Sequence, residues 1–92
     1  MQDLIKKLEE QQGKKISEFN QEDWSSISYY HDLSEDFIRE FQNKVYWIGI
    51  SIHQRLSEDF IREFQHEVKW ICVSRYQKLS EEFIREFQHK VD

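Results

Sequence analysis

A ten-residue segment occurs three times in this chain at a fixed spacing. LSEDFIREFQ begins at Leu33 and again at Leu56, and LSEEFIREFQ begins at Leu79. Successive copies therefore start 23 residues apart. A constant period of this length is typical of stacked supersecondary units rather than of one irregular globule. The sequence predicts a repeat protein.

Each copy carries the signals of a helix that begins at its serine. Ser34 in the first copy precedes two acidic residues, and serine is a good N-cap residue while acidic side chains favour the positive end of the helix dipole. Phe37, Phe41 and Val45 then lie at i, i+4 and i+8, which places them in one apolar stripe. Arg39 stands four residues after a glutamate, the spacing of an ion pair on a solvated helix face.

A second pattern precedes each copy and begins with tryptophan. Trp24, Trp47 and Trp70 are followed at offset 3 by an aliphatic residue and at offset 4 by serine, and at offset 7 by His31 or a glutamine. The alternative is a β-strand, because residues 45–52 are rich in β-branched and aromatic side chains. The recurring offsets follow the period of a helix, so a helix is favoured.

These patterns predict an all-α fold, a short α-solenoid of helical hairpins in one domain. Residues 1–23 are expected to form an N-terminal capping helix and a connector, with Gly13 ending the helix and Asp23 as the N-cap of the next one. Each hairpin contains one Trp-bearing helix and one Phe-bearing helix. The three hairpins are 24–46, 47–69 and 70–92.

Composition excludes several classes of function. Thirteen basic and 18 acidic residues give a net charge of −5 without a basic tract, which disfavours direct binding of nucleic acid. With 34% charged residues, a membrane span is not expected. Cys72 is the only cysteine and no secretory signal is visible, so we expect a cytoplasmic protein.

The sequence contains no recognisable reaction chemistry. The four histidines, His31, His53, His66 and His89, have no metal-ligand spacing with a Cys or carboxylate partner. Cys72 has no obvious activating base, and a Gly-rich phosphate loop is missing. We therefore expect no enzyme, no cofactor and no metal.

The unit L-S-E-[DE]-F-I-R-E-F-Q-x-[KE]-V-x-W-I-x-[IV]-S-x-x-Q resembles 23-residue tandem repeats in proteins of phages, large DNA viruses and some anaerobic bacteria. The resemblance covers Trp24 to Asp92. It implies a repeat architecture, an origin in a mobile element and a place in the host cytoplasm, and no activity comes with it. Tyr46 and Lys69 stand where such repeats often have Asp before Trp, which removes an expected helix cap.

One face of the Trp-bearing helices differs from unit to unit, at offsets 1, 2, 5 and 6, whereas the Phe-bearing helices are nearly identical. Tyr, Ile and Arg on that face have the composition of an interface. We expect it to bind another protein; the alternative is that some of these residues pack on the next helix and the rest have drifted. The predicted partner-binding residues are Tyr29, Tyr30, Ile48, Ile52, His53, Ile71, Arg75 and Tyr76.

Two further hypotheses concern the remaining surfaces. The third copy has no polar capping variant, although solenoid ends normally need one, so we expect self-association into a homo-oligomer through Phe83, Ile84, Phe87 and Val91. A different class of function is a small acidic inhibitor of a host nuclease or defence protein, which would occupy a nucleic-acid channel with the Glu and Asp side chains of the Phe-bearing helices. Binding by such a mimic should weaken steeply with salt.

Overall fold

The computed structural model describes residues 1–91, and within them it contains seven α-helices, one 3-10 helix and no strand. The choice of helix over strand for the Trp-bearing segments is therefore confirmed. In chain order the elements are α1 (Gln2–Gln12), η1 (Ile16–Glu18), α2 (Gln21–Tyr30), α3 (Glu35–Glu40), α4 (Trp47–His53), α5 (Glu58–Glu63), α6 (Trp70–Tyr76) and α7 (Glu81–Glu86).

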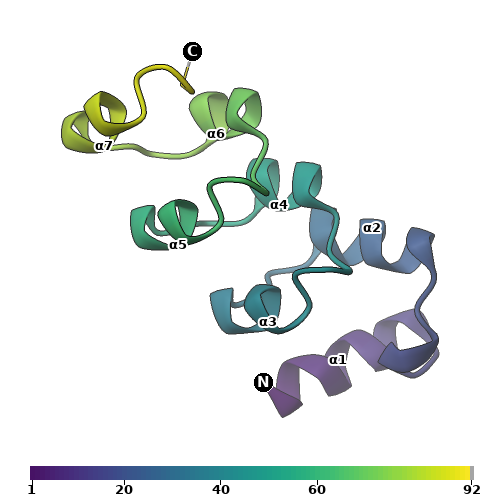
Figure 1. Cartoon of the computed structure of the whole chain (residues 1–92). Helices are drawn as coiled ribbons and strands as arrows, with labels where there is room; N and C mark the ends of the chain where they lie inside the picture. The colour runs from purple at the N-terminus through teal and green to yellow at the C-terminus, as the bar shows by residue number, and fades with distance from the viewer. Residues whose placement is uncertain (92) are drawn as a thin grey trace.

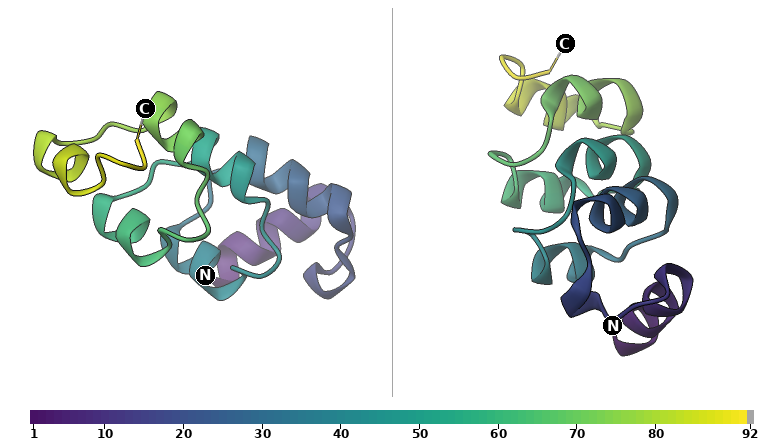
Figure 2. Two further views of the ribbon diagram at one scale, coloured as in Figure 1. Left: turned by 45° about the horizontal axis from the view of Figure 1, so that its top comes forward. Right: turned by 90° about the vertical axis from the view of Figure 1, so that its right-hand side faces the viewer.

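The helices form two parallel rows (Figure 1, Figure 2). Helix α4 packs against α2 on one side and α6 on the other, and α3, α5 and α7 follow one another in the second row. We call α2–α3, α4–α5 and α6–α7 units 1, 2 and 3. The molecule is elongated, 43 × 21 × 18 Å, with α1 at one end and unit 3 at the other. No helix in the described range is long and apolar enough to cross a membrane.

The predicted helix ends are mostly confirmed. The Ser34 hydroxyl accepts a hydrogen bond from the Phe37 N–H at 3.1 Å, and the serines of the other two units do the same. Gly13 ends α1 with φ 73°, a left-handed conformation that favours glycine. These caps fix where each short helix begins and ends.

The predicted N-cap at Asp23 is wrong, because α2 begins one turn earlier. Asn20 is the N-cap: its Oδ1 accepts from the Asp23 N–H at 3.0 Å, and Asp23 Oδ2 accepts from the Asn20 N–H at 2.9 Å. The two residues form a capping box. The Asn20 N–H and the Lys14 ammonium, 3.0 Å away, lower the pKa of Asp23.

An aromatic cluster recurs in the core of every unit. In unit 1 the ring centroids of Trp24 and Phe41 are 5.3 Å apart, and those of Phe37 and Phe41 are 4.7 Å apart. The same three-ring arrangement occurs in the other two units, as Trp47, Phe60 and Phe64 and as Trp70, Phe83 and Phe87. Each unit therefore joins its two helices through rings from both rows.

Helix α1 is not part of the repeat and covers the end of unit 1 that faces away from unit 2. Leu8 is fully buried, and Leu4 and Ile5 pack against the core while remaining partly exposed. Ordinary apolar packing attaches this helix to the end of the stack.

Candidate protein-binding surface

A glutamine from each following unit holds the A-type helices (α2, α4 and α6) at a fixed spacing. Gln54 Oε1 accepts from the Leu33 N–H at 2.9 Å, and its Nε2 donates to the carbonyls of Ser28 at 3.1 Å and His31 at 2.7 Å. Gln77 makes the equivalent three bonds to unit 2. All three hydrogen bonds of each glutamine side chain are made to the preceding unit, so the spacing along this row is specified.

A buried serine of the preceding unit binds the backbone where each of α4 and α6 begins. Ser28 Oγ donates to the Trp24 carbonyl at 2.7 Å and accepts from the Tyr46 N–H at 3.0 Å. Ser51 Oγ accepts from the Lys69 N–H at the same distance. The side chains of Tyr46 and Lys69 make no N-cap hydrogen bond, as the sequence predicted. Their backbone N–H groups donate instead to a serine of the preceding unit.

The B-type helices (α3, α5 and α7) are joined by ion pairs. Arg39 binds Glu63 of the next unit with its Nε and Nη2, both at 2.9 Å, and Asp36 with its Nη1. Glu35 accepts from the Ser57 N–H at 2.7 Å and from its hydroxyl at 3.1 Å. The hydrogen bonds between Arg39 and Glu63 raise the pKa of Arg39 and lower that of Glu63.

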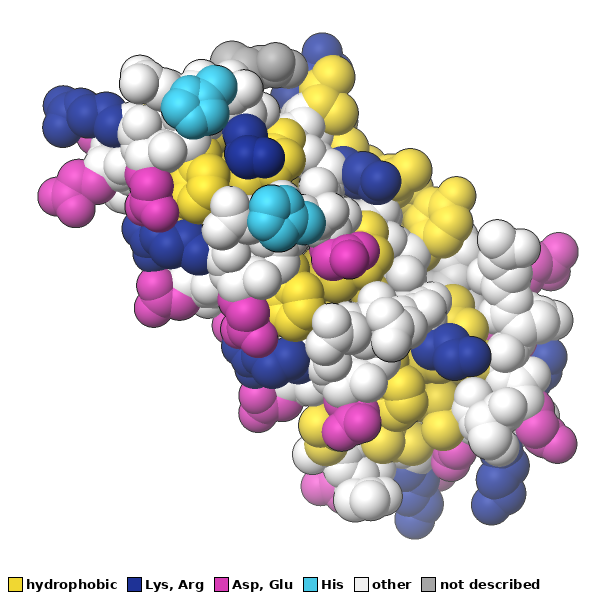
Figure 3. Space-filling model, in the orientation of Figure 1, with side chains coloured by type: hydrophobic (Ala, Val, Ile, Leu, Met, Phe, Trp, Pro, Cys, Tyr) yellow, Lys and Arg dark blue, Asp and Glu magenta, His cyan; other side chains and the backbone are white. Residues whose placement is uncertain are grey.

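The expected pairing four residues apart within one helix is therefore wrong for units 1 and 2. Arg39 and Arg62 both turn toward the following unit. Among the described residues that pairing forms only in α7, where Arg85 Nη2 lies 3.6 Å from Glu81 Oε2. Figure 3 shows the result as basic and acidic side chains alternating along the edge formed by α3, α5 and α7.

The opposite side of the molecule, along the A-type helices, exposes large apolar side chains. The exposed fractions are 79% for Tyr30, 58% for Tyr76 and 57% for Ile71, and Ile48 and Tyr46 are each 37% exposed. Hydrophobic side chains reach the surface along the upper right edge of Figure 3, over α4 and α6. His53 and Arg75 are also exposed. We call this surface the outer face.

Two of the predicted partner-binding residues, Tyr29 and Ile52, are only half exposed. The Tyr29 ring lies 5.2 Å from the His53 ring and 6.0 Å from the Tyr46 ring, and burial raises the pKa of its hydroxyl. A Cβ on Gly49 would come within 3.0 Å of Tyr29 Cδ2. Tyr29 thus belongs to the packing between α2 and α4. The glycine inside a predicted helix was the signal for this close approach.

Two shallow hollows flank Tyr46 on the outer face. The larger, about 400 Å³, lies between α2 and the start of α4 and is lined by Gln21, Glu22, Ser25, Ser26, Tyr30 and Tyr46. The other, about 280 Å³, is lined by Val45, Tyr46, Trp47, Ile48 and Lys69. The predicted partner-binding residues did not include Tyr46, because Tyr46 was interpreted only as the replacement of a helix-capping Asp.

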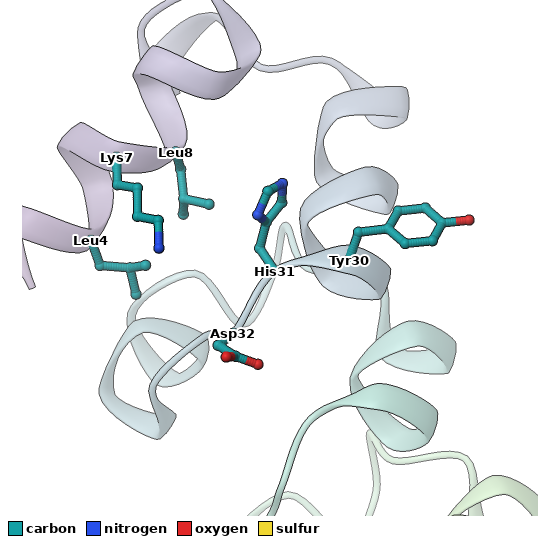
Figure 4. Close-up of a pocket in the computed structure, with 6 residues that line it drawn as sticks. All are labelled: Leu4, Lys7, Leu8, Tyr30, His31 and Asp32. Carbon is teal, nitrogen blue, oxygen red and sulfur yellow. The ribbon is translucent and has the colours of Figure 1, made fainter.

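A third hollow, about 200 Å³, lies where α1 meets unit 1 (Figure 4). Leu4, Lys7 and Leu8 from α1 face His31 across it, whereas the Tyr30 ring points away toward the outer face. Lys7 and His31 share no hydrogen bond within residues 1–91, and the described part of the chain contains no group of three or more Cys, His, Asp and Glu that could hold a metal. This hollow is a junction between packed elements.

The predicted self-association strip at the third unit needs correction. Phe83 is fully buried and Phe87 is 6% exposed, because both rings pack on Trp70 of their own unit. Ile84 remains 42% exposed, and Val91 is partly buried. The apolar surface at this end is therefore centred on Ile84.

Comparison with family models, curated proteins and solved structures gives no match to this chain. Its surfaces are therefore interpreted from their own geometry.

Proposed function

We propose that this protein is a non-enzymatic interaction module that binds another protein through the outer face. One observation carries the proposal: five of the seven large hydrophobic side chains exposed within residues 1–91 lie along the row of A-type helices. They are Tyr30, Tyr46, Ile48, Ile71 and Tyr76. An apolar group of this kind, in which three of the five residues are tyrosines, has the composition of an interaction site.

The two hollows beside Tyr46 define how a partner would be held. Each is open and shallow, and each presents an aromatic wall with polar groups on its rim, Ser25 in one case and Lys69 in the other. Burying one Ile, Leu or Phe side chain of a partner in such a hollow stabilises a complex by about 1.5–3 kcal/mol. Two anchors placed on either side of Tyr46 would supply the core of a weak to moderate interface.

The spacing of the row selects the partner's geometry. Packed helices lie about 8–10 Å apart, so neighbouring hollows repeat at about that distance. A helix that presents apolar side chains at i and i+7 spans about 10.5 Å and matches this interval. The partner we propose is therefore a protein with an exposed amphipathic helix.

The competing proposal, an acidic inhibitor that imitates nucleic acid, is supported less well. Its active surface would be the carboxylates of the B-type helices. Most of these are already engaged: Glu63 and Asp36 with Arg39, and Glu35 with Ser57. Charges of both signs alternate there, whereas mimicry of a phosphate backbone needs unneutralised negative charge.

The test captures partners from an extract of the source cells on three immobilised proteins. These are the wild type, the double variant Tyr30→Ala with Ile48→Ala, and the control Glu40→Gln, which changes an exposed residue of α3. The interaction module should retain partners on the wild type and the control, and lose them on the double variant. Raising the salt from about 0.05 to about 0.5 M should change little, because an apolar interface is not screened.

A different pattern of capture would favour the acidic inhibitor. Capture that survives in the double variant but disappears at high salt would support the acidic inhibitor. Circular dichroism of all three proteins checks that the substitutions, all at exposed residues, leave the helices intact.

A further inference from the structure

Units 1 and 2 present the same surface to the unit that follows them. In unit 1 this surface contains Ile38, which is fully buried, together with Arg39 and Glu35, which bind the next unit's Glu63 and Ser57. Unit 2 repeats it with Ile61, Arg62 and Glu58, whose partners are Glu86 and Ser80. We call this surface the joint face.

Unit 3 carries the same joint-face residues, Ile84, Arg85 and Glu81, and no other part of residues 1–91 covers them. Ile84 is 42% exposed, whereas its two counterparts are fully buried. The side chains of Arg85 and Glu81 are 75% and 88% exposed, and within residues 1–91 they form an ion pair only with each other. The backbone N–H of Leu79 stands where those of Leu33 and Leu56 bind a glutamine, and among residues 1–91 no glutamine takes that place.

The A-type helix of unit 3 extends the same surface. Ser25 shares a hollow with Tyr46 of the next unit, and Ile48 shares one with Lys69 of the next unit. The residue after each tryptophan therefore lies beside the following unit. Ile71 has this position in unit 3 and is 57% exposed. The open surface thus continues across both rows.

We propose that the joint face of unit 3 binds a further helical hairpin of the same repeat type, and that it does so when the hairpin is supplied as a separate polypeptide. The occupant is defined by chemistry that the two internal joints display. It is a helical hairpin with a glutamine directed at the Leu79 N–H, a Leu-Ser turn whose serine binds Glu81, and a glutamate that pairs with Arg85. This surface shares Ile71 with the outer face, but Ile84, Arg85, Glu81 and the Leu79 N–H lie outside the outer face, so the proposal does not rest on the proposed function.

A second copy of this chain does not present such a surface through its own first unit. There, α1 covers the end of unit 1 that faces away from unit 2, and its Leu8 is fully buried. His31 stands at the position of the clamping glutamine. The partner must therefore expose a unit that no capping helix covers.

The test adds a synthetic peptide with the sequence of residues 47–69 to the full-length protein, followed through the Ile84 methyl signals and the Leu79 amide signal by NMR. The expected result is saturable binding that shifts both signals. A Gln54→Ala peptide should bind about tenfold more weakly, because it leaves backbone groups unpaired. An Ile84→Glu protein should lose at least about tenfold in affinity and keep its circular dichroism spectrum, since Ile84 is partly exposed.

A charge exchange adds a readout that a general hydrophobic contact would not give. Arg85→Glu should weaken binding of the unmodified peptide, and a Glu63→Arg peptide should restore it. Failure of this restoration would contradict the assigned register.

A fused chain provides the second measurement, because a free 23-residue peptide must fold as it binds. A further copy of residues 70–92 appended in register should raise Tm and slow exchange of the Leu79 amide to the rate of the Leu56 amide. Unchanged Tm and exchange would overturn the proposal, and docking in the fused chain alone would overturn binding of a separate polypeptide. Concentration-dependent dimers of the unmodified protein that Ile84→Glu abolishes would also overturn it, by making a second copy the occupant.

Discussion

The two rows of helices differ in what their outward residues do. In the B-type row, residues such as Glu35 and Arg39 recur in every unit, and in the first two units they bind the unit that follows. In the A-type row, Tyr30 and Ile48 are open to solvent, and neither position is the same in all three units, since His53 and Ser25 stand at the equivalent places. Identity between units therefore marks the joints of the stack. Variation marks the surface that is free to recognise a partner.

The largest effect should come from removing an apolar residue at a joint. Ile61 in α5 is fully buried, so Ile61→Ala should lower the free energy of unfolding by about 3 kcal/mol. Ile48→Ala makes the same chemical change on the outer face and should cost less than about 1 kcal/mol. Urea unfolding followed by circular dichroism measures both. Equal losses would remove the distinction between the two surfaces.

A second pair of variants compares neighbouring residues at the end of α4. Gln54→Ala leaves the Leu33 N–H and two carbonyls of unit 1 without their partner, which should cost about 2–3 kcal/mol. His53→Ala changes an exposed side chain and should cost less than about 1 kcal/mol. Amide exchange at Leu33 provides a local measurement, since only the Gln54 variant should accelerate it.

The third prediction concerns Gly49, which is buried where α4 packs against α2. A methyl group on Gly49 would lie 3.0 Å from Tyr29 Cδ2 and 3.2 Å from the Ser28 carbonyl carbon. Gly49→Ala should therefore destabilise the protein by about 1 kcal/mol, even though alanine favours helix. Ser26→Ala is the matched control, because Ser26 has the equivalent position in α2. A more stable Gly49→Ala protein would show that α2 and α4 separate without cost.

Most of the fold could be predicted because its information is local and written three times. The serine caps, the Phe stripe and the helical offsets after each tryptophan are all short-range signals, and the structure confirms them. Asp23 was misassigned because Asn20, three residues earlier, is an equally good cap residue. Local signals place a helix end only to within about one turn when two cap residues compete.

The contacts between units could be predicted less well. Arg39 has an acidic residue four positions before it, and only the stacked arrangement shows that Glu63 of the next unit, 24 positions later, is the stronger partner. Phe83 was expected on the surface because the sequence does not show which side of a helix its own tryptophan covers. The two hollows beside Tyr46 could not be predicted either, because residues distant in sequence line them.

The smallest effect should come from the ion pairs of the B-type row, because their side chains are more than a third exposed. Arg39 lowers the pKa of Glu63, so the stabilisation is complete above the ordinary glutamate pKa, about pH 4.3, and is lost as pH falls through the lowered value. Glu63→Gln should thus lower Tm by at most a few degrees at pH 7, and the difference from wild type should shrink as the pH falls through the lowered pKa of Glu63. Glu40→Gln, in the same row, should show no such convergence. If the Glu63 difference persists at low pH, the joint depends on the shape of the side chain rather than its charge, and the repeated Arg–Glu pairs would fix the register of the units more than their stability.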